Sequence, residues 1–174
     1  MAKPRVTKQQ AEQAIFDRFV QAYSTHYGSR LVNPIHRDRP DFSAEDLDTR
    51  QTLGIEVTGV YQDAREAEIN YWLSGDWGII VGDIQGLVAN INRALQEKSD
   101  KAVQYENIGP LILAIWIGSF IFKTKTDIQF IQHELGVPKN PFSLVTLVIS
   151  KDDYTAPVLH ILEESPGWRN RESA

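Results

Sequence analysis

The chain contains no cysteine, and no apolar run approaches the roughly 20 residues that a membrane-spanning helix needs. The absence of cysteine excludes a disulfide scaffold, thiolate zinc sites and cysteine nucleophiles, and it fits a reducing, cytoplasmic setting. The first residues are polar and amphipathic, with no apolar signal core. We therefore expect a cytoplasmic protein that is neither secreted nor inserted in a membrane.

An excess of positive charge is missing as well. The 18 lysines and arginines are outnumbered by 23 aspartates and glutamates, which leaves a formal net charge of −5. A protein that binds nucleic acid tightly usually carries a basic surface. Nucleic-acid binding by this chain would therefore need a local basic patch, or a metal ion that offsets clustered carboxylates.

The remaining composition is that of an ordinary folded domain. Hydrophobic residues make up 42% of the chain and charged residues 24%, and 174 residues suit a single domain with a well-buried core. We expect one domain over residues 1–174, with a core from about residue 7 to residue 163. The polar tail, residues 165–174, is expected to be frayed.

Four segments have the apolar periodicity of helices, and they are residues 7–27, 62–73, 83–105 and 125–135. Thr7 is a suitable N-cap for the first helix, and Gly28 is a suitable stop. Residues 74–78 read as a loop. Gly136 is the expected end of the last helix.

Short apolar runs between these helices predict strands. A short apolar piece spans residues 30–34, and strands are expected at residues 42–44, 52–61, 111–117, 144–149 and 157–162. The continuous apolar run at 111–117 is typical of a central strand that is buried on both faces. Pro157 favours an edge position for the last strand. The order of elements predicts an α/β layered domain with a mixed central sheet flanked by helices.

Two carboxylates stand beside short apolar strands. Asp41 follows Pro40 at the start of one strand, and Glu56 lies fifteen residues later in the middle of the next. Alternation along a strand places Glu56 and Thr58 on one face and the apolar residues Ile55 and Val57 on the other. An antiparallel pairing of the two strands would bring Asp41 close to Glu56.

This pair has two interpretations. Two carboxylates and a backbone carbonyl, for which Val57 is the natural candidate, would supply the oxygen ligands that Mg²⁺ prefers. Alternatively, Asp41 is an ordinary turn residue, and Glu56 forms a structural ion pair with one of the arginines at positions 37, 39 and 50. A carboxylate inside an apolar strand needs a cation, a donor or solvent in either case.

The long helix at 83–105 carries a lysine on its apolar stripe. At about 100° per residue, Lys98 falls within roughly 20° of Leu87 and Ile91, while Lys101 lies at the border of the stripe and Tyr105 returns to the same face. A lysine on a buried stripe either meets a carboxylate or extends to water. The first alternative predicts that Lys98, with or without Lys101, reaches the site of Asp41 and Glu56.

The succession Pro40-Asp41, Glu56-Val57-Thr58, a long helix and an apolar strand resembles the PD-(D/E)XK nuclease superfamily, which has the restriction-endonuclease-like fold. The resemblance covers roughly residues 10–118. It implies that Asp41 and Glu56 bind Mg²⁺ or Mn²⁺, with Val57 as a further ligand. Thr58 stands where the family motif has a lysine. Family members in which a catalytic residue has migrated to a neighbouring helix suggest Lys98 or Lys101 as its replacement.

The resemblance also implies a function. It predicts metal-assisted hydrolysis of phosphodiester bonds in nucleic acid, with DNA as the first expectation, and it suggests Glu12 on the first helix as an additional acid of the site. A homodimer is also implied, since cutting two strands needs two sites. The alternative is a catalytically degenerate protein of the same fold that acts as a binding or assembly module, which Thr58 and the acidic charge favour. A third, weaker alternative is a hydrolase of smaller phosphate esters.

Overall fold

The computed structural model describes residues 6–61, 83–118, 122, 124–150 and 156–170. The helices are α1 (Lys8–Tyr27), α3 (Ile84–Ala102) and α4 (Lys125–Glu134). The strands are β1 (Leu31–His36), β2 (Phe42–Asp46), β3 (Thr52–Val60), β4 (Leu111–Ile117), β5 (Leu144–Ser150) and β6 (Pro157–Glu164). The helix expected at 62–73 and the loop expected at 74–78 lie outside the described residues.

The strands form one mixed six-stranded sheet in the order β1-β2-β3-β4-β5-β6. The pairs β1–β2, β2–β3 and β5–β6 are antiparallel, while β3, β4 and β5 run parallel at the centre. Pro157 begins β6 at one edge of the sheet, as predicted. Pro34 is tolerated within β1 because this strand forms the other edge, where the register shifts between Val32 and Ile35.

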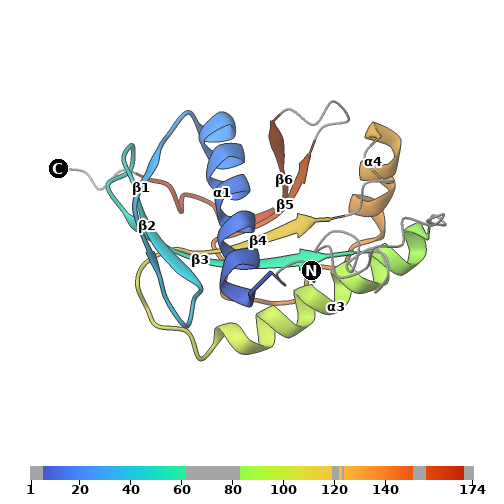
Figure 1. The fold of residues 1–174 in the computed structure, drawn as a ribbon, viewed down its shortest axis with the longest axis horizontal. Helices are drawn as coiled ribbons and strands as arrows, with labels where there is room; N and C mark the ends of the chain where they lie inside the picture. The colour runs from blue at the N-terminus through green and yellow to red at the C-terminus, as the bar shows by residue number, and fades with distance from the viewer. Residues whose placement is uncertain (1–5, 62–82, 119–121, 123, 151–155, 171–174) are drawn as a thin grey trace, which may run out of the picture.

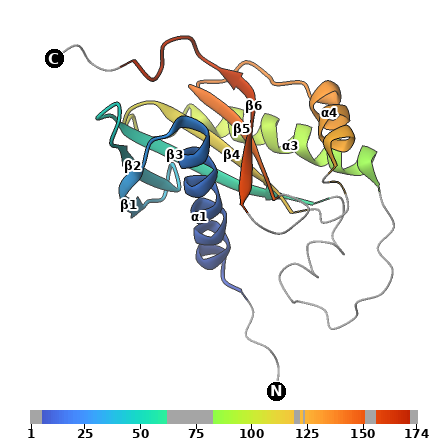
Figure 2. The ribbon, with the colours of Figure 1, turned by 90° about the horizontal axis from the view of Figure 1, so that it is seen from above.

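Helices cover both faces of the sheet (Figures 1 and 2). On one face, α1 packs against residues such as Leu53, Ile55 and Ala114. On the other face, α3 and α4 enclose a second core that includes Leu113 and Ile115. Because the parallel strands are buried on both faces, β4 is apolar along its whole length. The predicted α/β layered domain with a mixed, helix-flanked sheet is confirmed.

Local signals in the sequence fix the ends of the helices. The side chain of Thr7 caps α1 in a reciprocal arrangement with Gln10, and Gly28 ends this helix in the left-handed conformation with φ of 65°. α3 is shorter than expected, because the backbone N–H groups of Gln104 and Tyr105 bond three residues back and turn the chain after Ala102. Among the described residues, no helix has both the length and the hydropathy to cross a membrane.

The chain after β6 is packed against the domain, so the expectation of a frayed tail is wrong for residues 165–170. The backbone N–H of Ser165 donates to the carbonyl of Ser143, and the ring of Trp168 is buried. Its indole N–H donates to Glu164 at 2.8 Å. The guanidinium of Arg169 lies 4.2 Å from the centre of the Tyr27 ring. Polar residues in this segment therefore find partners within the domain instead of water.

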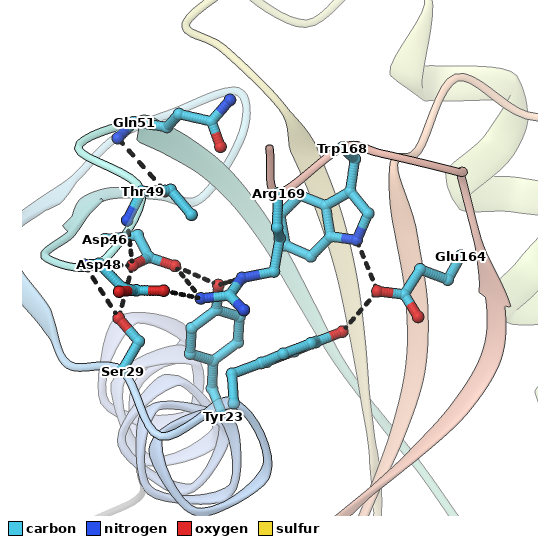
Figure 3. A network of polar contacts seen from close by, with 10 residues as sticks. Tyr23, Ser29, Asp46, Asp48, Thr49, Gln51, Glu164, Trp168 and Arg169 are labelled. Carbon is cyan, nitrogen blue, oxygen red and sulfur yellow. Dashed lines mark hydrogen bonds and ion pairs between the residues drawn. The ribbon is translucent and has the colours of Figure 1, made fainter. Parts of the chain in front are cut away.

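The main polar partner of this segment is Asp46 at the end of β2 (Figure 3). Its carboxylate is 1% exposed and accepts hydrogen bonds from the Tyr23 hydroxyl at 2.6 Å and the Arg169 guanidinium at 3.0 Å. It also accepts from the Ser29 hydroxyl and from the backbone of Asp48 and Thr49. The network joins α1, the β2–β3 turn and the C-terminal segment.

Candidate active site

The register of β2 on β3 brings the two predicted carboxylates together. Phe42 pairs with Ile55, so Asp41 lies beside the next residues of β3. The backbone N–H of Asp41 donates to Oε2 of Glu56 at 3.3 Å, and the N–H of Val57 donates to Oδ2 of Asp41 at 3.0 Å. The predicted antiparallel approach of Asp41 and Glu56 is confirmed. It places both side chains at the start of β2, beyond which β3 continues alongside β4.

A glycine in β3 allows this approach. A Cβ atom at position 54 would lie 3.0 Å from Cγ of Pro40 and 3.2 Å from Cδ1 of Leu111. Gly54 leaves that space to the proline ring, which can then pack directly on the strand. Pro40 is buried by this contact, and Asp41 follows it into the interior.

Lys98 reaches the carboxylates from α3. The buried residues Leu87, Ile91 and Leu95 fix this helix on the sheet, and the next turn carries Lys98 over β3. Its Nζ lies 2.5 Å from Oε1 of Glu56, and the two side chains are 22% and 5% exposed. The predicted approach of Lys98 to the carboxylate pair is confirmed.

The alternative partners of Glu56 lie elsewhere. Arg37 forms an ion pair with Glu106 at 2.7 Å. Arg39 donates to Oε1 of Gln104 at 3.2 Å. Arg50 lies in the β2–β3 turn, at the opposite end of that hairpin from Asp41. The structural ion pair of Glu56 is therefore made with the helix lysine and not with the arginines.

These residues line a cleft of about 410 Å³, which we call the Asp41–Glu56 cleft. Its walls come from α1, from the loop between β1 and β2, and from α3 with the turn that follows it. The lining residues are Lys8, Glu12, Asp38, Arg39, Asp41, Glu56, Lys98, Lys101, Gln104 and Tyr105. All five predicted catalytic residues are thus brought to one cavity, with Lys101 exposed at its mouth.

Glu12 faces this cleft from α1 and is not a freely solvated glutamate. Its side chain is 14% exposed and lies 3.2 Å from Nε2 of His36 and 3.3 Å from Nζ of Lys8. After burial and the charge of Glu56, the charge of Glu12 adds to the raised pKa of Asp41. The contacts with His36 and Lys8 hold Glu12 at the wall of the cleft.

Burial and like charge perturb the acids at the floor of the cleft. Burial, followed by the charge of Glu56, raises the pKa of Asp41 to about 6, although the N–H of Val57 and the ammonium of Lys98 act in the opposite direction. Burial, the charge of Glu56 and hydrogen bonding to that carboxylate raise the pKa of Tyr105. The Tyr105 hydroxyl therefore keeps its proton and can donate it to Glu56 in a hydrogen bond.

The donor atoms at this floor suit a hard cation. Within the parts of the chain that the structure describes, no group of three or more His, Cys, Asp or Glu side chains could hold a metal ion. The candidate ligands are the carboxylates of Asp41 and Glu56 and the carbonyl of Val57, which points to the same side of β3 as the N–H that meets Asp41. Mg²⁺ binds through one or two carboxylates and keeps several waters, so this set fits it. A cation bound here would offset the charge of Glu56, which adds to burial in raising the pKa of Asp41.

Thr58, which replaces the expected motif lysine, does not line the Asp41–Glu56 cleft. It borders a neighbouring cavity of about 310 Å³, together with Asn90, Arg93 and Glu97 of α3. The helix α3 thus passes over both Glu56 and Thr58. A lysine on this helix can occupy the space that a lysine at position 58 would otherwise reach.

Sequence reasoning missed three residues of the cleft, which are Lys8, Asp38 and Gln104, and it named Arg39 only as an alternative ion-pair partner of Glu56. Lys8 could have been found, because it lies one helical turn before Glu12. Arg39 and Gln104 depend on contacts between segments 65 positions apart. The hydrophobic periodicity of a helix or strand does not predict such a contact.

No family model, curated protein or solved structure matches the chain. An α/β layered fold supports many activities, so the fold does not identify the function. The chemistry must be argued from the residues of the cleft.

Proposed function

We propose that the chain is a metal-dependent nuclease that hydrolyses phosphodiester bonds at the Asp41–Glu56 cleft. The observation that carries this proposal is the contact of the Lys98 ammonium with Glu56, which is itself joined to Asp41. Two carboxylates can hold a metal ion that activates water, and an ammonium can stabilise charge on a phosphate, so this set of groups suits phosphodiester hydrolysis. The resemblance to the PD-(D/E)XK pattern supports the same chemistry with a relocated lysine.

Asp41, Glu56 and the carbonyl of Val57 would hold Mg²⁺ or Mn²⁺. A bound ion of this kind lowers the pKa of a coordinated water and stabilises negative charge on a phosphate. Asp41 is kept in place by the N–H of Val57, and Glu56 by the N–H of Asp41 and by Lys98. The protein thus orients both carboxylates in advance, through its backbone and one half-buried ammonium.

Lys98 has two roles in this proposal. Its ion pair with Glu56 holds that carboxylate in position at the floor of the cleft. Its remaining N–H bonds can stabilise the negative charge that develops on a phosphate oxygen while the oxygen of water bonds to phosphorus and the bond to the leaving sugar oxygen breaks. The proton lost by the water passes to solvent or to the leaving oxygen. Lys101 and Glu12 act at the wall and mouth of the same cleft.

A nuclease assay with three single substitutions tests this proposal. The variants Asp41→Asn, Glu56→Gln and Lys98→Ala are assayed on DNA and on RNA with Mg²⁺ or Mn²⁺, and we expect each to lose at least about 100-fold in kcat. The control is Glu97→Gln, which removes an exposed charge of α3 outside this cleft. Cleavage that is unchanged in all three variants would refute the assignment of the site.

A second candidate function is a catalytically degenerate binding or assembly module. The ion pair between Lys98 and Glu56 favours it, because this pair satisfies the buried carboxylate without a metal ion. The position of Thr58 outside the cleft favours it as well. Calorimetric titration with Mg²⁺ and Mn²⁺ separates the two functions. Binding that disappears in Asp41→Asn supports the nuclease, whereas no binding to the unaltered protein supports the module.

A further inference from the structure

The Asp41–Glu56 cleft has its charges in two layers. The carboxylates of Asp41 and Glu56 form the floor and are 7% and 4% exposed. Four charged side chains are exposed at the mouth. Three are the cations Lys8, Arg39 and Lys101, and the fourth is the carboxylate of Asp38. We call the three cations the cleft rim. The mouth is therefore positive on a chain whose net charge is −5.

We propose that the cleft rim binds the phosphates adjacent to the one at the floor, so that the ligand is a nucleic-acid strand and not a small phosphate ester. The placement of the cleaved phosphate at the floor rests on the proposed function. The binding of neighbouring phosphates rests on the rim alone. Cations surround the mouth from three separate elements, an arrangement that suits an anion extending across it.

Lys8 forms one side of the rim. It lies in the first turn of α1, 3.3 Å from Glu12. The pKa of Lys8 is raised, first by its hydrogen bond and charge interaction with Glu12 and to a smaller extent by the charges of Asp41 and Glu56. Its side chain is 90% exposed and lines the same cleft as the floor carboxylates. A phosphate bound here would share the cleft with the one at the carboxylates.

Arg39 adds to the rim from the loop between β1 and β2, and it is held in place. Its guanidinium donates to Oε1 of Gln104 at 3.2 Å, and its carbonyl accepts from the N–H of Glu106 at 3.2 Å. Arg39 lines the same cleft as Asp41 and Glu56. A fixed, planar group with further N–H donors is suited to phosphate oxygens.

Lys101 completes the rim from α3. It follows Lys98 by three residues, so the two lysines lie on neighbouring turns of the same side of the helix. Lys98 is half-buried and turned to Glu56, whereas Lys101 is exposed. Lys98 thus lies at the floor of the cleft, and Lys101 lies at its mouth. A strand that crosses the mouth would meet Lys101 while one of its phosphates reaches Lys98.

The three rim cations make a small phosphate ester a poor fit. A lone phosphate at the floor meets two buried carboxylates and one ammonium that is already paired. A strand gains three further cationic contacts, each of which releases counterions. The rim therefore favours a strand that carries several phosphates over a small ester that carries one phosphate. Backbone contacts of this kind carry no base preference.

Binding measured without cleavage tests this inference. Fluorescence anisotropy is recorded with labelled single strands of about 20 nucleotides, one of DNA and one of RNA, in EDTA and at about 50 to 200 mM salt. The variants are Lys8→Ala, Arg39→Ala and Lys101→Ala, and the control is Lys125→Ala, an exposed lysine on α4. We expect each rim variant to lose affinity by about threefold to tenfold and to reduce the salt slope by about 0.7. The loss should be the same for DNA and RNA.

Two results would overturn the inference. One is rim variants whose affinity and salt slope match those of Lys125→Ala, or an unaltered protein that binds neither strand. The other is a mononucleotide that competes as well as an unlabelled strand, because a single phosphate would then be sufficient. Since no cleavage is measured, a protein that shows the rim effect but has no nuclease activity retains the inference and refutes only the proposed function.

Discussion

The ammonium of Lys98 lies 2.5 Å from Oε1 of Glu56, although the two residues are 42 positions apart in the chain. Glu56 is in β3 and Lys98 is in α3, so the contact depends on the packing of a helix over a parallel strand. The other oxygen of Glu56 accepts the N–H of Asp41. One buried carboxylate thus connects the helix lysine to the second acid of the site.

A lysine introduced at position 58 should partly take over the function of Lys98. Thr58 and Glu56 lie two residues apart on the same face of β3, so a lysine side chain at 58 can reach Glu56. We expect Lys98→Ala to lower kcat by about 100- to 1,000-fold, and Thr58→Lys in that background to recover about tenfold. Steady-state cleavage of a labelled oligonucleotide measures both effects.

The matched control for this exchange is Thr58→Gln in the Lys98→Ala background. Glutamine has a long polar side chain without the charge, so it reproduces the bulk of lysine and not its electrostatic effect. Equal activity of the glutamine and lysine double variants would contradict the view that Lys98 replaces a lysine of β3.

Asp41 should destabilise the folded protein when no cation is bound. Its pKa is raised to about 6 in the fold, so the ionised form is less favourable there than in the unfolded chain. We expect Asp41→Asn to raise the free energy of unfolding at pH 7 by about 1 kcal/mol, a value already reduced for solvent screening. Urea unfolding with EDTA present measures this difference.

The control for this prediction is the pH dependence of the difference in unfolding free energy between Asp41→Asn and the unaltered protein. A group with a raised pKa adds stability below its unfolded pKa of about 3.9, and this stability is lost as the pH rises through the folded value of about 6. The advantage of Asp41→Asn should therefore be present at pH 7 and absent near pH 4. An advantage of equal size at both pH values would show that another interaction is its source.

Cation binding should weaken in acid for the same reason. The proton on Asp41 competes with Mg²⁺ or Mn²⁺, because a carboxylate must be ionised to act as a ligand. We expect the affinity to be constant above about pH 7 and to fall by up to tenfold per pH unit below about pH 6. Calorimetric titration of Mn²⁺ between pH 5 and 8 tests this. A flat profile in that range would exclude Asp41 as a ligand.

The core of the site could be predicted from the sequence because its determinants are local. Alternation along β3 separates Glu56 from Ile55 and Val57, and a short turn makes the pairing with the preceding strand antiparallel. Helical phase alone places Lys98 on the buried stripe of α3. Each of these inferences needs only the periodicity of one helix or strand, or the antiparallel direction of one pair of strands.

The rest of the site could not be predicted because it depends on contacts between distant segments. Arg39 reaches the mouth of the cleft through Gln104 and Glu106, and no periodic pattern links these positions. The C-terminal segment shows the same limit. Its polar residues resemble a solvated tail, yet Arg169 pairs with Asp46 across 123 positions.

Arg169 should contribute to stability although it lies near the end of the chain. Removing it leaves the buried carboxylate of Asp46 without its ionic partner, while the bonds from Tyr23 and Ser29 remain. We expect Arg169→Ala to lower the free energy of unfolding at pH 7 by about 2 kcal/mol. The control is Arg30→Ala, which removes an exposed arginine. Equal urea midpoints for the two variants would contradict the prediction.

The loss caused by Arg169→Ala should also decrease in acid. Burial alone would raise the pKa of Asp46, but hydrogen bonds from Ser29, Tyr23 and Arg169 outweigh it and lower the pKa to about 2. Stability from a group with a lowered pKa is present above its unfolded value of about 3.9 and is lost as the pH falls through the folded value. Urea unfolding at pH 7, 4 and 2.5 should therefore show the two arginine variants converging. A difference that is as large at pH 2.5 as at pH 7 would assign the effect to the stacking of Arg169 on Tyr27 instead of its charge.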